Sequence, residues 1–145
     1  MSEAGPAGCV LGVGVDLVHV PGFAEQLARP GSRFADVFTP GERRDAETGA
    51  GGQAEHLAAR WAAKEALVKA WSATLHGSPP VMGDEALGQI ELVRDAWGRP
   101  RLRLHGQVAA HLSGVRSHVS ISHDGDHAIA YVVLSEEPAP VQSRP

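Results

Sequence analysis

The fold of this chain is decided by the stretch Arg60-Trp61-Ala62-Ala63-Lys64-Glu65-Ala66-Leu67-Val68-Lys69-Ala70-Trp71. It predicts a helix from about 54 to 72, because at ~100° per residue its large apolar side chains share one arc of the helical wheel. Arg60 and Lys64 fall inside this apolar arc, and Glu65 borders it beside Trp61. An unpaired charge on a packed face is strongly destabilising. Charges held there therefore predict a functional site.

Composition narrows the class of protein. The chain has 145 residues, 43% hydrophobic and 21% charged, as expected for one globular domain of ordinary composition. No apolar run is long enough to span a bilayer, and we expect neither a secretory signal nor a membrane partner. The single cysteine, Cys9, fits a reducing cytoplasm and is expected to be a small apolar residue at the start of a strand. A net charge of −4 argues against broad nucleic-acid binding, but leaves room for a local anion site.

The order of predicted elements indicates an α+β fold with an antiparallel sheet and packed helices. One domain, 9–135, is expected between flexible tails at 1–8 and 136–145, which are rich in Pro, Ser, Gly and Glu. Strands are predicted at 10–18, 89–94, 101–105, 118–122 and 128–134, and further helices at 21–28, after Thr39, and at 107–112. Thr39-Pro40-Gly41-Glu42 has the pattern of a capping box, and Asp124-Gly125 that of a hairpin turn.

The first strand carries a candidate site residue. Leu11, Val13, Val15 and Leu17 share one face, and Gly12, Gly14 and Asp16 share the other. Glycines let a backbone or a ligand approach the face that holds Asp16. The plain alternative is an aspartate that caps the end of a strand. A dinucleotide-binding loop is not indicated, since the third glycine and an immediate helix are lacking.

Glu65 is the second candidate. Its plain interpretation is an i,i+4 pair with Lys69, worth ~0.2–0.5 kcal/mol. The neighbouring cations, Arg60 and Lys64, favour instead a cradle for phosphate oxygens. Asp16 and Glu65, if brought together, would offer two oxygens to a hard cation such as magnesium.

The end of the strand at 118–122 is the third candidate. The chain has eight histidines, but no two lie at i,i+4 on a helix and thiolate ligands are lacking, which argues against zinc. Ser120, Ser122 and His123 lack the glycine elbow of a serine hydrolase. His123 and Asp124 remain candidates because they stand where strands commonly place functional groups.

Three motifs together resemble the holo-[acyl-carrier-protein] synthases, the small 4′-phosphopantetheinyl transferases. They are Gly12-Val13-Gly14-Val15-Asp16, the helix motif Arg60-Trp61-Ala62-Ala63-Lys64-Glu65-Ala66, and His118-Val119-Ser120-Ile121-Ser122-His123. Phe38-Thr39-Pro40-Gly41-Glu42 and Trp97-Gly98-Arg99-Pro100 also stand where that family has comparable segments. The similarity covers nearly the whole chain between the tails.

The resemblance implies a reaction, in which phosphopantetheine passes from coenzyme A to a serine of an apo acyl carrier protein and adenosine 3′,5′-bisphosphate leaves. It implies that Asp16 and Glu65 are the Mg²⁺ ligands and that Lys64 and Lys69 hold phosphate oxygens. Arg60 is expected at the nucleotide.

The same resemblance leaves three catalytic assignments open. The serine proton would pass to Glu65 or to a water on the metal. His123 and Asp124 are expected to contact coenzyme A or to assist proton movement.

The resemblance also implies a homotrimer with sites at subunit interfaces, serving fatty acid or polyketide biosynthesis in the cytoplasm. The chain departs from the family in one respect. Family members that use acidic free-standing carrier proteins present several basic residues on the first helix, and the helix at 21–28 lacks them. A carrier domain of a larger synthase is therefore also a candidate partner. The loop 76–88 has no assigned role. The alternatives are a non-catalytic module that binds coenzyme A or a nucleotide, and a structural subunit whose charges form salt bridges only.

Overall fold

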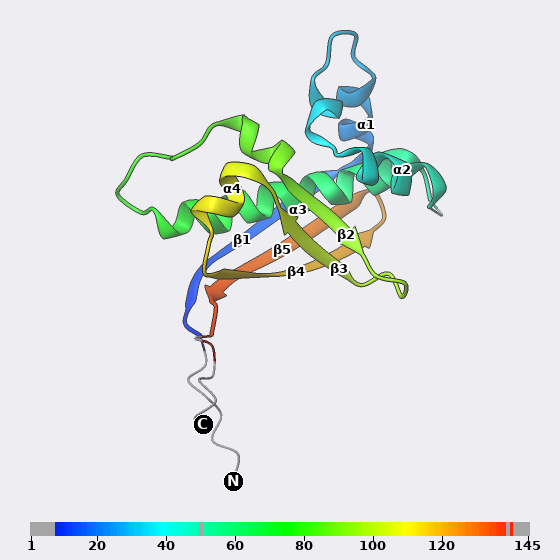
Figure 1. Cartoon of the computed structure of the whole chain (residues 1–145). Helices are drawn as coiled ribbons and strands as arrows, with labels where there is room; N and C mark the ends of the chain where they lie inside the picture. Colours follow the sequence, from blue (N-terminus) through cyan, green and yellow to red (C-terminus); the bar gives the residue numbers. More distant parts are fainter. Residues whose placement is uncertain (1–7, 50, 139, 141–145) are drawn as a thin grey trace.

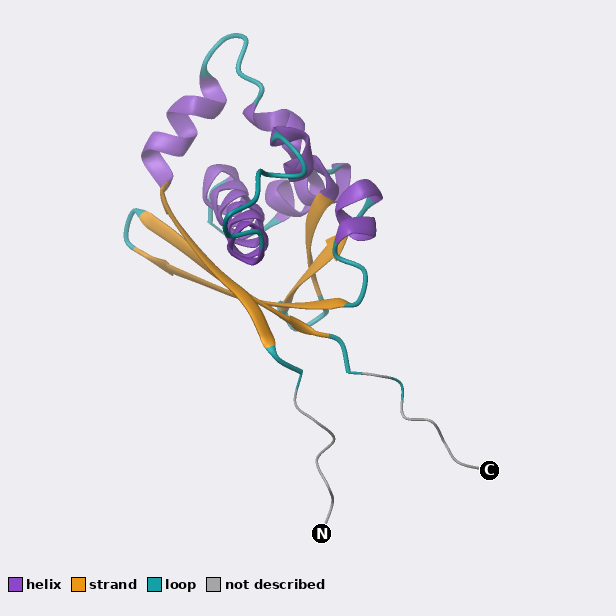
Figure 2. Ribbon diagram, turned by 90° about the vertical axis from the view of Figure 1, so that its left-hand side faces the viewer, coloured by secondary structure: helices purple, strands orange, loops and turns teal. Residues whose placement is uncertain are grey.

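A long helix lies across one face of a three-stranded antiparallel sheet in the computed structural model, which describes residues 8–49, 51–138 and 140 (Figure 1). The helix is α3 (Gln53–Thr74), and the strand order is β1 (Val10–His19), β5 (His127–Glu136), β4 (Val115–Asp124). Figure 2 looks nearly along α3 and shows the helices gathered on one side of this sheet. The arrangement confirms the predicted α+β class with an antiparallel sheet.

The remaining elements surround α3. They are α1 (Val20–Ala28), the 3₁₀ helix η1 (Phe34–Val37), α2 (Pro40–Thr48), the 3₁₀ helix η2 (Asp84–Gln89), β2 (Ile90–Arg94), β3 (Pro100–Leu104) and α4 (Gly106–His111). Strands β2 and β3 form a separate antiparallel pair. Every predicted helix and strand is present. The two 3₁₀ helices were not predicted, because such short turns carry no periodic apolar pattern.

Strand boundaries follow the pairing partner. β4 begins at Val115 rather than at the predicted His118, because it pairs with β5 along its whole length, from Val115 opposite Glu136. The predicted tails, 1–8 and 136–145, lie mostly outside the described residues. Glu136 is the last residue of β5, and its N–H donates to the Cys9 carbonyl at 2.9 Å.

The predicted capping box is confirmed at the start of α2. The Glu42 N–H donates to Thr39 Oγ1 at 3.1 Å, and the Thr39 N–H donates to Glu42 Oε1 at 3.0 Å. These two hydrogen bonds satisfy donors that a helix start leaves open. They also fix the Glu42 side chain, which is fully buried, toward the interior.

Small residues let α3 pack directly on β1. A Cβ atom added at Gly14 would lie 2.0 Å from the Ala66 carbonyl oxygen, and one at Gly12 would lie 2.2 Å from that of Ala70. The facing side chains on α3 are alanines with no exposed surface. The glycines therefore admit the helix backbone to the strand, and Asp16, next along the same face, is carried to the side of α3.

The other face of the same sheet is apolar and exposed. Val13, Val15 and Leu17 are 49%, 47% and 63% exposed, and their neighbours Tyr131 and Ile129 on β5 are 47% and 38% exposed. We call these five residues the outer apolar face. A patch of this kind on a soluble protein commonly marks an interaction surface.

Across residues 8–49, 51–138 and 140, no helix has both the length and the apolar character needed to cross a bilayer.

Candidate functional site

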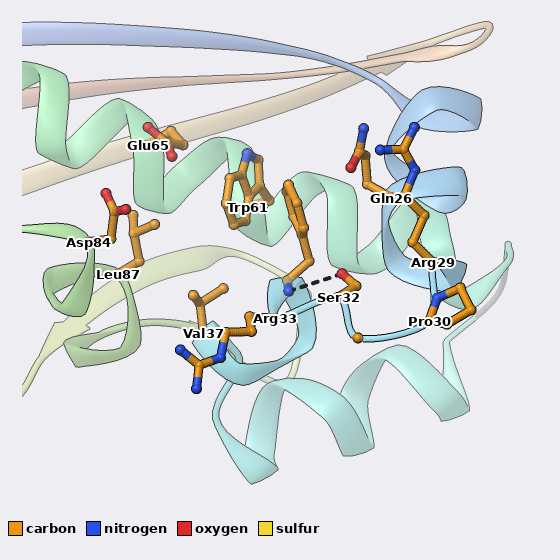
Figure 3. Close-up of a pocket in the computed structure, with 12 residues that line it drawn as sticks. Gln26, Arg29, Pro30, Ser32, Arg33, Val37, Trp61, Glu65, Asp84 and Leu87 are labelled. Atoms are coloured by element: carbon orange, nitrogen blue, oxygen red, sulfur yellow. Dashed lines mark hydrogen bonds between the residues drawn. The ribbon is translucent and has the colours of Figure 1, made fainter.

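A cavity of about 730 Å³ opens beside the middle of α3 (Figure 3). Trp61 and Glu65 reach it from α3, and Asp84 and Leu87 reach it from η2. The segment between α1 and η1 closes the other end and contributes two cations, Arg29 and Arg33. The Trp61 ring packs against Phe34, with centroids 4.9 Å apart. The cavity therefore has an aromatic wall, a basic end and an acidic end.

The acidic end is built where β1 meets α3. The Lys69 ammonium lies 2.9 Å from Asp16 Oδ1 and also donates to the Val15 carbonyl at 3.0 Å. Among the described residues Lys69 therefore pairs with Asp16, and not with Glu65 as the plain i,i+4 alternative would have it. The Asp16 side chain is only 15% exposed, whereas that of Lys69 is 53% exposed. The fold thus brings Asp16 together with Glu65 and Lys69, which lie 49 and 53 positions later in the chain.

Glu65 is held in an unfavourable electrostatic environment. Burial raises the pKa of its carboxyl group, the negative charge of Asp16 raises it further, and the positive charge of Lys69 opposes the rise. Asp84 of η2 adds a smaller contribution that also raises this pKa. Carboxylates that disfavour one another's charge favour a bound cation. The site therefore has the donors and the charge that a hard cation requires.

Lys64 does not line this cavity, and the phosphate-holding role predicted for it stays a prediction. Its side chain is fully buried, and Nζ lies 2.8 Å from Glu42 Oε1. Nζ also donates to the carbonyl of Leu87 at 3.2 Å and to that of Ile90. Successive helical residues point ~100° apart, and here Lys64 points to Glu42 and the Leu87 carbonyl whereas Glu65 points to the cavity. Burial lowers the pKa of Lys64, and Glu42 opposes that effect.

Arg60 is also turned away from Asp16 and Glu65. It is 1% exposed, donates to the His56 carbonyl at 3.1 Å, and lies 3.6 Å from Asp45. Its Nε has no hydrogen-bond partner among the described residues. Burial and the nearby charge of Arg94 lower its pKa, against the attraction of Asp45. The role predicted for Arg60 at a nucleotide stays a prediction.

His123 and Asp124 stand at the end of β4, on the other side of α3 from β1. His123 Nδ1 lies 3.6 Å from Glu55 Oε1, in the first turn of α3. Asp124 is paired with His127 in the hairpin register. Among the described residues, no hydrogen bond or ion pair connects either of them to Asp16 or Glu65. Their predicted roles are therefore not supported by contacts within one chain.

Two contributors to this region were missed by sequence reasoning. Asp84 belongs to a 3₁₀ turn with no recognisable pattern, so only the structure shows that it lines the cavity with Glu65. Glu42 was read as a helix cap alone. A capping glutamate is normally half-exposed, and its full burial is the signal that it has a second partner, Lys64.

Comparison with known proteins places the chain in a family. The model of the 4′-phosphopantetheinyl transferase superfamily matches residues 12–132. The holo-[acyl-carrier-protein] synthase of Mycobacterium ulcerans (strain Agy99) is 54% identical over 125 residues, covering 86% of this chain and 96% of that protein. The synthase of Mycobacterium tuberculosis (strain H37Rv) is 53% identical over the same shares.

Solved structures agree. An acyl-carrier-protein synthase bound to coenzyme A from Chronobacterium ammoniagenes superposes with a TM-score of 0.80 at 53% identity, covering 86% of this chain and 96% of that one. The Mycobacterium tuberculosis acyl carrier protein synthase superposes with a TM-score of 0.75 at 48% identity, covering 88% and 99%. The chain therefore belongs to the 4′-phosphopantetheinyl transferase superfamily and is a transferase.

Proposed function

We propose that this phosphopantetheinyl transferase moves the 4′-phosphopantetheine group of coenzyme A to a serine hydroxyl of an apo acyl carrier protein or carrier domain. Adenosine 3′,5′-bisphosphate is the other product. The observation that carries the proposal is the convergence of Asp16 and Lys69 on Glu65, which lines one end of a cavity. The names of its relatives and the coenzyme A complex of the Chronobacterium protein support it. We place the reaction in the cytoplasm, where it would supply fatty acid or polyketide synthesis.

The carboxylates of Asp16 and Glu65 fit a magnesium ion. Both offer hard oxygen donors, and burial and Asp16 raise the pKa of Glu65 against the opposing charge of Lys69, which favours a bound cation. No cluster of three or more potential metal ligands occurs in the described ranges. Two carboxylates suit magnesium, which fills its shell with water and substrate phosphate. When bound, the ion would neutralise charge on the phosphorus under attack and on the leaving phosphate.

Lys69 is the phosphate-binding cation of the proposal. Its half-exposed ammonium can exchange Asp16 for a phosphate oxygen when the proposed magnesium ion neutralises Asp16 in its place. Glu65 is a candidate acceptor for the serine proton, because its carboxylate lines the cavity. Arg60, with its unpartnered Nε and the nearby Arg94, would gain from an anionic group of the nucleotide.

A homotrimer is the proposed assembly. The outer apolar face supports it, because β1 and β5 expose neighbouring apolar side chains that water would otherwise cover. In such an assembly we expect His123 and Asp124 to serve a site on a neighbouring copy. Light scattering coupled to gel filtration measures the assembly, and Leu17→Asp should shift the particle to monomer. A chain that is monomeric before this substitution would contradict the assembly.

The deciding experiment is incubation of the chain with coenzyme A, Mg²⁺ and an apo carrier protein, followed by intact mass spectrometry. A gain of one phosphopantetheine that disappears with EDTA is the expected result. No gain on any of several carriers would contradict the proposal. The two alternatives separate in a binding experiment. A non-catalytic module would bind coenzyme A without mass gain, and a structural subunit would not bind it.

A further inference from the structure

Behind the cavity, the structure holds a buried ion pair that the proposed chemistry does not use. Lys64 and Glu42 are both fully shielded from solvent and lie 2.8 Å apart. The Phe38 ring lies 5.7 Å from the Lys64 ammonium. Such pairs rarely stabilise a protein more than apolar side chains of similar volume would. The pair therefore calls for an explanation other than stability.

The two side chains together satisfy backbone groups from several elements. Glu42 Oε1 accepts from the Thr39 N–H and from Lys64, and Oε2 accepts from the Leu92 N–H at 3.1 Å. Lys64 in turn donates to the carbonyls of Leu87 and Ile90. A carboxylate suits this arrangement because both its oxygens face donors, which a glutamine could not match. The pair thus ties α2 and α3 to both ends of the η2–β2 junction.

That junction forms one wall of the cavity. Leu87 presents its side chain to the cavity while its carbonyl oxygen is held by Lys64. Asp84, one turn earlier in η2, faces the same cavity. Lys64 is joined by a peptide bond to Glu65 on the other side of α3. Lys64, which holds the η2 wall, and Glu65, which the wall faces across the cavity, are therefore adjacent in sequence.

We propose that Lys64 and Glu42 are positioning residues, which fix the η2 wall at a set distance from Glu65. Apolar replacements would fill the same space but would leave the carbonyls of Leu87 and Ile90 and the N–H of Leu92 without fixed partners. The wall would then shift along α3. This inference rests on the proposed function only for its effect on catalysis, because the fixed wall is a property of the free chain.

The test compares Lys64→Met, which leaves Glu42 buried and unpaired, with Lys64→Met/Glu42→Met, which removes both charges. The double variant should melt above the single one, because no uncompensated charge remains. Its kcat should nonetheless stay at least ~10-fold below that of the wild-type chain, with the KM for coenzyme A changed less than ~3-fold, as for a misplaced group. The matched control is Leu134→Ala, a buried β5 residue away from the cavity, which lowers the melting temperature and leaves kcat unchanged. A double variant with the kcat of this control would overturn the proposal.

Hydrogen exchange gives a readout that needs no activity. In the double variant, amides of 84–92 should exchange at least ~10-fold faster relative to those of β5, the central strand of the three-stranded sheet, which serves as the reference. Equal rates would overturn the proposal. If the variants do not fold, hydrogen exchange of the wild-type chain in mild urea tests the proposal. The amides of 84–92 and those at the centre of α3 should then become exposed at the same urea concentration, and separate exposure would overturn the proposal. If the wild-type chain shows no transfer, the proposed function fails, and these exchange rates still judge the positioning role.

Discussion

Lys64 and Glu65 are neighbours on α3 with opposite environments. Lys64 is fully buried and meets a carboxylate and two carbonyl oxygens. Glu65 lines a cavity, where the charge that affects its pKa most is the carboxylate of Asp16. A buried charge with matched partners is a structural element, whereas a charge held beside a like charge is unfavourable until a ligand arrives. The charge of the neighbouring groups, rather than burial alone, thus distinguishes the Lys64 side of α3 from the Glu65 side.

The largest effect is expected from Glu65→Gln, which breaks the functional side alone. Loss of one proposed metal ligand and proton acceptor should lower kcat by ~10³-fold or more. The free energy of unfolding should not fall, because the carboxylate is in an unfavourable environment. Single-turnover mass spectrometry at saturating coenzyme A measures the rate, with the exposed Glu47→Gln as control. Retained activity would remove Glu65 from the proposed site.

The same substitution on the two sides sharpens the comparison. Lys64→Met should lower the free energy of unfolding by about 3–5 kcal/mol, because it leaves the buried carboxylate of Glu42 without its cationic partner. Lys69→Met should lower it by less than ~1 kcal/mol, since its pair with Asp16 is half-exposed. The catalytic effect of Lys69→Met should be large although its stability effect is small: the variant should fold normally and lose ~10²-fold in kcat/KM. Urea unfolding and the transfer assay give both values, and equal stability losses would contradict the distinction.

Gly14→Ala tests how the functional side is assembled. The new methyl group would meet the Ala66 carbonyl oxygen, so α3 must move away from β1. We expect a loss of about 1–3 kcal/mol from overpacking. Activity should fall as well at temperatures where the chain is folded, because Asp16 moves with β1 and Glu65 with α3. The control is Gly88→Ala, where an added Cβ meets nothing within 4 Å. A Gly14→Ala variant with wild-type activity would show that the close approach does not set the site.

The elements with strong local signals were predictable from the sequence. The apolar arc of α3, the capping box at Thr39 and the glycine face of β1 depend on residues a few positions apart. The partners of the charges on α3 were not predictable, because Lys64 meets Glu42 and Lys69 meets Asp16 through the tertiary fold. The helical wheel placed Lys64 in the buried arc correctly. It could not show that Glu42, 22 positions earlier in the chain, pairs with Lys64 there, so the sequence predicted only a phosphate for this cation.

The outer apolar face shows a second limit. Alternation along β1 separated its two faces correctly, and apolar residues are usually expected to face the helix layer. Here the glycine face meets α3 and the valines face outward. Alternation reports which residues share a face, but the choice of partner depends on the volume available. The glycines of β1 and the alanines of α3 bring the two backbones so close that no larger side chain fits between them.

The smallest expected effect is a pH dependence of stability at Glu65. Its pKa is raised above the usual 4.5 in the folded chain, so the unfolded chain releases this proton first as pH increases. The stability from the neutral carboxyl group is therefore complete below pH ~4.5 and is lost as pH rises through the folded pKa. Glu65→Gln cannot ionise, so in EDTA its melting temperature should match that of the wild-type chain near pH 4 and exceed it slightly at pH 7.

Two controls separate this effect from a general one. Asp16→Asn removes the second cause of the raised pKa, so the difference between glutamate and glutamine at position 65 should shrink in that background. Mg²⁺ should raise the melting temperature of the wild-type chain at pH 7 and leave that of Glu65→Gln nearly unchanged, because a ligand stabilises only the state that binds it. If the difference in melting temperature between the wild-type chain and Glu65→Gln stayed constant from pH 4 to pH 7, the folded chain would not disfavour the ionised form of Glu65. Lys64 and Glu65 would then differ only in where they lie on α3.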